Sequence, residues 1–592
     1  MFNVANRFVI QNTASTQTIF WQRASVVGCL VWMFMSIVPA SAEVRIDGVD
    51  GDTQAVVLAF LSIDELPCDA PRWWIEYRLK QLRPEIGRAM GALGFYNPEV
   101  TTTLDRSDAC WTLRVAIKPG DQVRVRSFDL EIDEPLANEP LVTELRTGKG
   151  LVLDVPFSHE AYEGLKEQLL DTAQDLGYFD AEFSRHQVRI DPVLNAADID
   201  LAIAGGARYR IGEILTDQTA LEPELFARYL RIREGQPYDA RDLLESYKNL
   251  SESDYFSRVL ITPLVDSRED GLVPVRVAVV PSPRRLLQLG GGYATDTGPR
   301  VRGDVTYRRL NDRGHRASTN TLLSTLVNKV ALGYRLPYGD PLEQWLFAEA
   351  SYNDEETDTS ESKSYAVGVG RNHRRGRHWT ETNHIDYTVT DFSVGDQHES
   401  RSNLLILGSS WGRTSAIDAP RPLSGYSINL DLRGSVKQLL SDNDFLQLIV
   451  RAKHILPLGN RIRLLSRINA GWIQADEFEE LPPSVRFFAG GDNSVRGYEY
   501  ESLGPEENGD VVGGRKLLTG SLEADIRIRN NWSLALFVDS GSAFDGNPEF
   551  STGVGAGIRW YSPLGPVRLD LAHPLDDPDT SIRIHFSLGP DL

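Results

Sequence analysis

The chain has 592 residues, with 62 Lys or Arg and 83 Asp or Glu, so its formal charge at pH 7 is −21. That balance excludes a general nucleic-acid-binding protein, which needs a basic surface. A hydrophobic fraction of 41% excludes a disordered chain, and three cysteines exclude a disulfide-dense scaffold. A mean hydropathy of −0.28 argues against a polytopic helical membrane protein. It allows a β-barrel, whose wall alternates apolar and polar residues.

Residues 1–42 predict a secretory signal peptide. Arg7 and Arg23 precede an apolar run over residues 24–38, and an Ala-Ser-Ala cleavage site follows at 40–42. The alternative is an uncleaved anchor, but the run is short for a spanning helix, which needs about 20 residues. Removing residues 1–42 takes away two arginines and changes the formal charge to −23. No later segment is apolar enough for a transmembrane helix. Together with the signal peptide, this predicts that the chain is exported.

Two cysteines, Cys68 and Cys110, remain after residue 42. Export places them in an oxidising compartment, which predicts one structural disulfide between them. The alternative is a pair of free buried thiols. Their spacing fits neither a metal site nor a C-x-x-C redox pair, and we expect neither a metal nor a cofactor.

Residues 43–283 predict three copies of a small α+β domain. A Leu-Gly-aromatic-aromatic motif at 93–96 returns at 176–179, and a degenerate copy lies at 253–256. This spacing of about 80 residues indicates tandem repeats. Each copy has the pattern β-α-α-β-β, with helical apolar spacing in its middle and a glycine at the helix end. The predicted boundaries are 43–121, 122–206 and 207–283.

Residues 284–592 predict a 16-stranded antiparallel transmembrane β-barrel. Short alternating segments replace the helical pattern, and an even number of strands of about ten residues is typical of outer-membrane barrels. From residue 515, odd positions are mostly polar and even positions mostly apolar, as lumen and lipid faces require. The alternative is a large soluble β-sandwich. Candidate strands begin near 286, 299, 315, 326, 343, 363, 377, 401, 424, 444, 460, 515, 532, 551, 564 and 580.

The connection over residues 475–514 is far longer than ordinary connections, and such loops are usually functional or disordered. It contains Arg496, whose planar guanidinium is suited to clamping carboxylates. The next two strands place Glu523 and Asp539 on their inward faces. We therefore predict that the loop folds into the lumen and that Arg496 contacts both carboxylates. The alternative is a solvent-exposed extracellular loop with a surface arginine.

Four short motifs in this half resemble those of the Omp85 superfamily. Residues 495–498 (Val-Arg-Gly-Tyr) resemble the V-R-G-[FY] motif of the sixth loop, and 537–541 (Phe-Val-Asp-Ser-Gly) resemble F-x-D-x-G. Residues 520–523 resemble G-x-x-E, and 557–566 resemble the following strand pair. The resemblance implies periplasmic POTRA repeats, an outer-membrane barrel and two sets of site residues. These are a loop clamp (Val495, Arg496, Gly497, Tyr498, Glu523, Asp539) and a barrel motif (Phe537, Gly541, Gly557, Arg559).

The same resemblance implies an assembly or translocation factor rather than an enzyme. Three POTRA repeats before 16 strands are similar to the translocation and assembly module branch, which implies help with inserting or secreting β-barrel proteins such as autotransporters. It also implies a TamB-like partner, anchored in the inner membrane, that docks on the POTRA domains, and contacts with client proteins and outer-membrane lipid. POTRA sheet edges and a weak seam between the first and last barrel strands would bind extended clients. The seam residues are Leu286, Leu289, Ile584 and Phe586.

Other functions remain open at this stage. A general barrel-assembly insertase of the same superfamily usually has five POTRA domains, and a two-partner secretion pore usually has two and a plug helix. A passive porin would not need three periplasmic repeats. Residues 408–412 fit the G-x-S-x-G motif of hydrolases, which requires a strand-turn-helix. No helical pattern follows it here.

Overall fold

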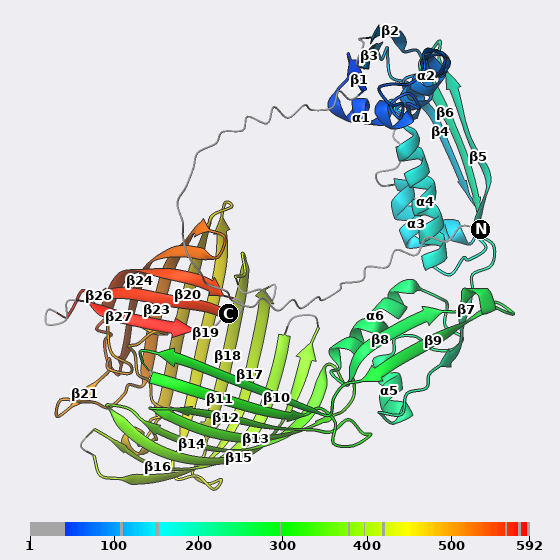
Figure 1. The fold of residues 1–592 in the computed structure, drawn as a ribbon. Coiled ribbons are helices and arrows are strands. Elements are labelled where there is room, and N and C mark those ends of the chain that lie inside the picture. Colours follow the sequence, from blue (N-terminus) through cyan, green and yellow to red (C-terminus); the bar gives the residue numbers. More distant parts are fainter. Residues whose placement is uncertain are drawn as a thin grey trace, which may run out of the picture. The chain divides into compact units, whose positions relative to one another are not determined.

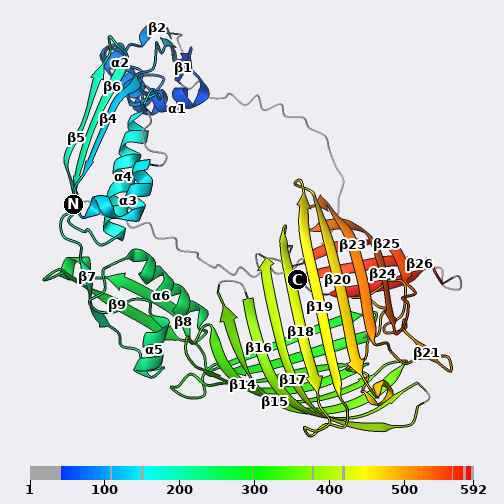
Figure 2. The same cartoon turned by 180° about the vertical axis from the view of Figure 1, so that it is seen from behind.

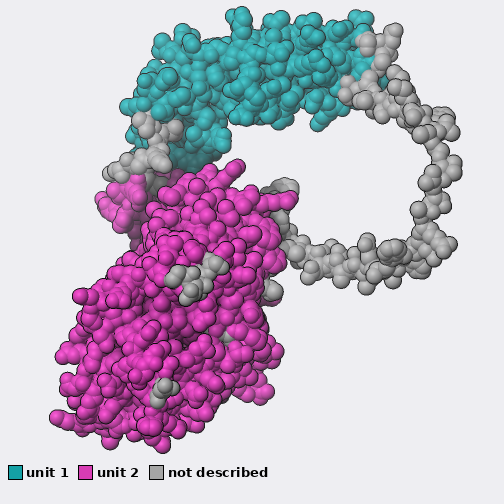
Figure 3. Space-filling model, turned by 90° about the vertical axis from the view of Figure 1, so that its left-hand side faces the viewer, with its two compact units in different colours: residues 1–130, 147–167, 185–201 teal, residues 131–146, 168–184, 202–592 magenta. Residues whose placement is uncertain are grey.

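The computed structural model describes residues 42–588, apart from residues 107–109, 148–152, 297, 377–378, 396, 417–420, 563–564 and 578–581. The predicted signal peptide therefore lies outside the described residues, except for Ala42. The chain divides into two compact units (Figure 3). The first comprises residues 1–130, 147–167 and 185–201, and the second comprises residues 131–146, 168–184 and 202–592.

The first repeat consists of a three-stranded sheet and two helices. Its sheet has the order β1-β3-β2, with β1 parallel and β2 antiparallel to the central strand. Asp50 caps the first helix by accepting a 2.8 Å hydrogen bond from the Thr53 backbone. The elements are β1 (Glu43–Asp47), α1 (Gly51–Phe60), α2 (Arg72–Ala92), β2 (Glu99–Arg106) and β3 (Trp111–Lys118).

The second and third repeats have the same element order, so the predicted β-α-α-β-β pattern in three copies is confirmed. The second contains β4 (Arg124–Ile132), α3 (Pro140–Thr147), α4 (His159–Asp175), β5 (Glu182–Asp191) and β6 (Ala196–Ala204), with a 3-10 turn at Leu136–Asn138. The third contains β7 (Arg210–Leu215), α5 (Pro223–Tyr229), α6 (Ala240–Glu252), β8 (Phe256–Pro263) and β9 (Leu272–Pro281), with a 3-10 turn at Val265–Ser267.

The remaining long strands form one 16-stranded antiparallel sheet that curls into a nearly closed barrel, as predicted (Figures 1 and 2). Each strand pairs with the next along the chain, and each begins within three residues of its predicted start. The strands are β10 (Arg285–Ala294), β11 (Gly298–Tyr307), β12 (Arg316–Ser324), β13 (Val327–Pro337), β14 (Gln344–Glu356), β15 (Ser360–Arg375), β16 (Trp379–Val394), β17 (Ser400–Ala416), β18 (Gly425–Ser435), β19 (Phe445–Leu458), β20 (Ile462–Ala475), β23 (Lys516–Arg529), β24 (Trp532–Phe544), β25 (Ser551–Ser562), β26 (Gly565–Pro574) and β27 (Arg583–Leu588).

The two faces of the barrel wall differ as a membrane barrel requires. Along β24, Ser533, Ala535 and Asp539 point inward and are buried, whereas Leu536 and Val538 point outward and are exposed. Trp532 and Trp560, at neighbouring strand ends, stack at 5.9 Å, as in the aromatic girdles at membrane interfaces. Across the described ranges, none of the helices is long and apolar enough to cross a membrane.

The third repeat is joined to the barrel by several polar contacts. The Tyr255 hydroxyl donates a 2.5 Å hydrogen bond to the Gly314 carbonyl in the turn between β11 and β12. The guanidinium of Arg316 lies 4.3 Å from the Tyr255 ring centroid and donates to the Ser253 carbonyl. Only three residues separate β9 of this repeat from β10, the first strand of the barrel. The third repeat and the start of the barrel therefore form one connected body.

Candidate functional site

The long connection between β20 and β23 folds back against the inner wall of the barrel. It contains a 3-10 turn (Phe478–Glu480) and a two-stranded ribbon of β21 (Glu506–Glu507) and β22 (Asp510–Val511). Its apolar side chains pack in one buried cluster with inward-facing residues of the wall. The cluster contains Leu404, Ile406, Phe445, Ile449, Ile473, Phe478, Leu481, Val485, Phe487, Ala489 and Ala543.

Polar side chains then tie the loop backbone in place. Arg486 is buried and donates to the carbonyls of Leu481 at 2.8 Å and Val512 at 2.9 Å. From the wall, Gln447 donates to the Val485 carbonyl at 2.6 Å. These bonds satisfy backbone carbonyls that would otherwise be buried without a partner, so the irregular chain is tolerated inside the barrel.

Arg496 lies at the centre of the predicted clamp. Its Nε is 2.7 Å from Asp539 Oδ2 and its Nη2 is 3.0 Å from Asp539 Oδ1, which is a bidentate ion pair. Its Nη1 is 2.8 Å from Glu523 Oε2. The guanidinium carbon stacks 3.4 Å from the Phe537 ring centroid. The Arg496 and Asp539 side chains are 7% and 0% exposed, so both charges depend on this pairing.

The clamp also includes a carboxylate that the sequence motifs did not indicate. Asp570, on β26, accepts from Arg496 Nη1 at 3.1 Å and from Arg559 Nη1 at 2.5 Å. Arg559 also donates to Glu523, from Nε at 3.2 Å and Nη2 at 2.9 Å. Two guanidinium groups thus alternate with three carboxylates over β23, β24, β25 and β26. The cluster joins four strands and the loop in one buried network.

The glycine at position 557 makes room for this network. A Cβ atom there would lie 1.8 Å from Asp570 Oδ1, too close for any side chain. The neighbouring strand pairing explains the approach, because Gly557 and Asp570 are register partners on β25 and β26. Any larger residue would displace the carboxylate on which both arginines depend. The role of this motif glycine is therefore steric.

The other residues of the loop motif also contact the wall. Val495 is fully buried and faces Gly541, and the Tyr498 hydroxyl is 3.4 Å from the Thr552 carbonyl. Gly497 has a φ of 104°, a conformation that favours glycine. Its N–H donates to His585 Nε2 at 2.9 Å, on the last strand. The motif therefore connects the loop to the end of the barrel.

A second contact with the two end strands involves Asp296, Asp492 and His585. His585 Nδ1 is 2.5 Å from Asp492 Oδ1, and the Asp492 N–H donates to Asp296 Oδ2 at 2.5 Å. Burial, and secondly the nearby Asp492 charge, raises the pKa of Asp296 to about 6. The three side chains are close enough to hold a metal ion. Both ring nitrogens of His585 are already engaged, however, so we assign a hydrogen-bonded latch.

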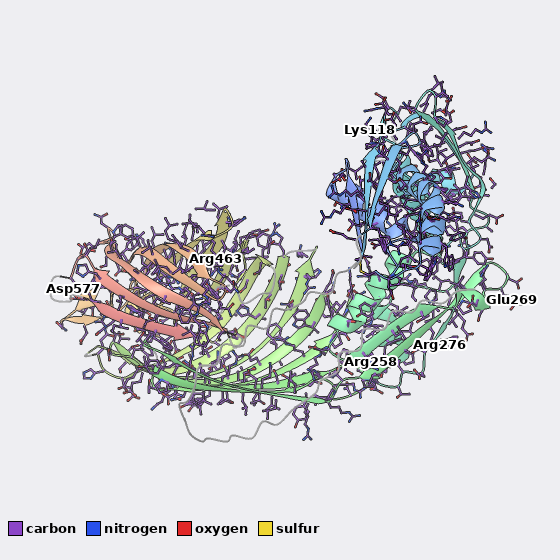
Figure 4. The ribbon with its side chains drawn as sticks, turned by 45° about the horizontal axis from the view of Figure 1, so that its top comes forward. Lys118, Arg258, Glu269, Arg276, Arg463 and Asp577 are labelled. Atoms are coloured by element: carbon purple, nitrogen blue, oxygen red, sulfur yellow. A yellow bond between two sulfur atoms is a disulfide. The ribbon has the colours of Figure 1, made fainter. Side chains whose placement is uncertain are left out.

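Another buried ion cluster lies on the inner wall. Asp525 is 0% exposed and accepts from Arg463 Nε at 2.9 Å, from Arg421 Nη2 at 3.0 Å and from the Tyr561 hydroxyl at 2.6 Å. Arg463 also donates to the Pro422 carbonyl at 2.8 Å (labelled in Figure 4). This cluster draws the turn between β17 and β18 against the inner wall. No sequence motif indicated it.

The seam between β10 and β27 is held by few bonds. Among the residues that the structure describes, these strands share no hydrogen-bonded ladder. Thr295, directly after β10, donates its N–H to the Phe586 carbonyl at 3.2 Å and accepts from the Phe586 N–H through its hydroxyl at 3.0 Å, and Arg300 of β11 donates to the Leu588 carbonyl at 2.9 Å. Phe586 also lies 6.0 Å from Tyr293, ring to ring. Of the other predicted seam residues, Leu286 pairs with Thr306 of β11, while Leu289 and Ile584 are exposed outward. The end of β10 therefore forms the contact.

Two further features of the sequence, the cysteine pair and the G-x-S-x-G stretch, can be located in the structure. Cys68 and Cys110 form a disulfide within the first repeat. Residues 408–412 lie inside β17, where Ser409 donates a 2.6 Å hydrogen bond to Asn383. Because β17 is paired on both sides, this stretch forms no nucleophile elbow.

Family models match the first repeat and the barrel. The Omp85 superfamily domain matches residues 298–591, and a POTRA domain described as TamA domain 1 matches residues 43–119. The chain belongs to the Omp85 superfamily. This Omp85 protein is an outer-membrane protein, with its POTRA domains in the periplasm.

Relatives and solved structures agree with this assignment. The outer membrane protein assembly factor BamA of Nitratidesulfovibrio vulgaris is 24% identical over 447 residues, which cover 71% of this chain and 56% of that protein. BamA of Neisseria meningitidis serogroup B is 24% identical over 81% of this chain and 68% of its own length. The chain thus spans a little over half of the first relative and about two thirds of the second. A crystal structure of Haemophilus ducreyi BamA lacking POTRA domains 1-3 has the same fold, with a TM-score of 0.67, 18% identity, and coverage of 79% of this chain and 99% of that one.

Proposed function

We propose that this Omp85 protein inserts or secretes outer-membrane β-barrel proteins such as autotransporters, by pairing an incoming strand at the seam between β10 and β27. In this proposal its POTRA domains bind clients and a TamB-like partner anchored in the inner membrane. The observation that carries it is the seam, where a few hydrogen bonds near the strand ends stand in place of a ladder among the described residues. No nucleotide is needed, because client folding and the partner would supply the free energy.

The energetics of the seam favour strand addition. The direct hydrogen bonds across the seam are few, and each contributes only about 0.5–1.5 kcal/mol, so opening the seam costs less than separating a fully paired ladder. Unpaired backbone groups that face hydrocarbon cost several kcal/mol each. The free edges of the ten-residue β10 and the six-residue β27 are therefore stabilised by a client strand. Meanwhile, the Arg496 clamp keeps β23 to β26 and the loop together while the seam opens.

A disulfide across the seam tests this mechanism. The double variant Thr295→Cys with Phe586→Cys joins the two end strands, and the full chain is assayed for inserting an autotransporter barrel into vesicles. A matched control joins ladder partners Leu332 and Ala350 of β13 and β14 by the same double cysteine substitution. Single-cysteine variants are measured in the same oxidising buffer, so the native Cys68–Cys110 disulfide stays intact.

We expect the seam disulfide to lower insertion at least about tenfold and the ladder disulfide to leave it unchanged. Equal insertion by both cross-linked proteins would refute the seam mechanism. The second candidate, a general barrel-assembly insertase, is favoured by the names of the two BamA relatives. A client panel separates the two: activity on porin barrels and autotransporters alike supports the general insertase, whereas activity on autotransporters alone supports the first proposal.

A further inference from the structure

One side of helix α2 in the first repeat exposes large aromatic residues. Trp73 is 70% exposed and Tyr77, one turn later, is 56% exposed. Lys80 and Arg88 lie on the same side at helical spacing and are also exposed. The opposite side is buried in the core of the repeat. These four residues define what we call the α2 face.

The α2 face is basic within an acidic domain. Helix α2 carries five basic and two acidic residues, whereas the rest of residues 43–119 carries four basic and ten acidic ones. Both acids of the helix are already engaged: Glu85 is buried and accepts from the Ser62 hydroxyl at 2.6 Å, and Glu76 pairs with Arg72 at 2.7 Å. Among the described residues, neither Lys80 nor Arg88 has an ion-pair partner. Their charges are available to an external anion.

Aromatic and basic side chains in this arrangement match a phospholipid surface. Trp and Tyr rings favour the headgroup level of a membrane, where an apolar body and a polar tip are both accommodated. Each Lys or Arg near an anionic leaflet adds attraction, which weakens within a Debye length. Because the rest of residues 43–119 carries four basic and ten acidic residues, an anionic surface is repelled by the remainder of this domain and approaches it best at the α2 face.

We propose that the α2 face binds anionic phospholipid headgroups of the periplasmic leaflet of the inner membrane. We assign the phospholipid to the inner membrane because two further repeats separate this domain from the barrel along the chain. The inference goes beyond the proposed insertion function and does not depend on it. Its chemistry needs only surface charge and two interfacial aromatic rings.

Vesicle flotation of the full chain tests the proposal. The protein is held in phosphatidylcholine nanodiscs and mixed with vesicles of phosphatidylcholine, with or without phosphatidylglycerol. We expect co-flotation only with phosphatidylglycerol vesicles, lost at high salt, and reduced at least about tenfold by Lys80→Glu with Arg88→Glu. The control, Arg114→Glu with Lys118→Glu on β3, makes the same change in net charge and keeps binding (Lys118 is labelled in Figure 4).

Three outcomes overturn the proposal. The first is equal flotation by the α2-face variant and the native chain, or equal binding to both kinds of vesicle. The second is a blue shift of tryptophan fluorescence when phosphatidylglycerol is placed in the nanodisc and no vesicles are added, provided that Trp73→Phe lacks the shift. The α2 face would then contact the membrane that holds the barrel. The third is no vesicle binding combined with loss of a co-purifying protein in the variant, which would make the face a protein-docking surface. Client insertion is read separately, so failure of the seam mechanism is distinguishable.

Discussion

Replacing Arg496 with alanine is expected to release the long loop from the inner wall. The substitution leaves Asp539, which is 0% exposed, with the backbone N–H of residue 496 as its one remaining hydrogen-bond donor among the described residues. Removing one partner of a buried ion pair costs about 3–5 kcal/mol. The ratio of bound to released loop should therefore fall roughly 10²-fold to a few thousandfold. Glu523 and Asp570 retain Arg559, so the wall itself should stay folded.

Hydrogen exchange of the loop amides measures this ratio directly, and heat-modifiable gel mobility reports whether the barrel remains closed. Arg496→Lys keeps the charge but loses the bidentate geometry, so its exchange should fall between those of the native chain and Arg496→Ala. Arg496→Ala combined with Asp539→Ala should cost less than the sum of the single changes, since the orphaned carboxylate is gone. We also expect reduced client insertion by Arg496→Ala. Unchanged loop exchange in Arg496→Ala would contradict the clamp.

Three further predictions concern other parts of the chain. Gly557→Ala should lower the temperature at which heat-modifiable mobility is lost, because its Cβ displaces Asp570 at a cost of about 1–3 kcal/mol; an unchanged temperature would show that the network tolerates the shift. Cys68→Ser with Cys110→Ser should destabilise the first repeat by about 2–5 kcal/mol in denaturant titrations followed by proteolysis, and an unchanged midpoint would contradict this. The raised pKa of Asp296, about 6 against an ordinary 3.8, favours the closed loop below about pH 4 and loses that contribution as the pH rises through 6. The protection of the loop amides, measured relative to their intrinsic exchange rates at each pH, should therefore fall between pH 4 and pH 8, with a smaller fall in Asp296→Asn.

The fold could be predicted closely from the sequence because its periodicities are geometric. Side chains of a strand alternate between faces, so the polar and apolar positions from residue 515 indicated the lumen and lipid faces directly. The spacing of the Gly-aromatic motifs likewise indicated three repeats. Less could be predicted where a boundary depends on tertiary packing. The last strand, expected from about residue 580, begins at Arg583.

The clamp was predictable only in part. Arg496, Glu523 and Asp539 follow from a loop arginine and the parity of two neighbouring strands. Asp570 joins them through the register of β25 and β26, which a single sequence does not contain. The latch between Asp492 and His585 depends on where the barrel closes, and the Arg463–Asp525 pair depends on the register of β20 and β23. Contacts of this kind arise from barrel closure and strand register rather than from local pattern.

The junction of the third repeat with the barrel has a mechanical consequence. Tyr255 and Arg316 fasten this repeat to the start of β12 and to the turn before it, and β9 continues into β10 after three residues. A force applied to the repeat is therefore transmitted to the first strands of the sheet as a torque, with little slack between them. Among the described residues, β27 at the opposite edge of the sheet has no comparable contact with the third repeat. A force on the periplasmic side therefore acts directly on the β10 edge of the seam and reaches the β27 edge only through the rest of the barrel wall.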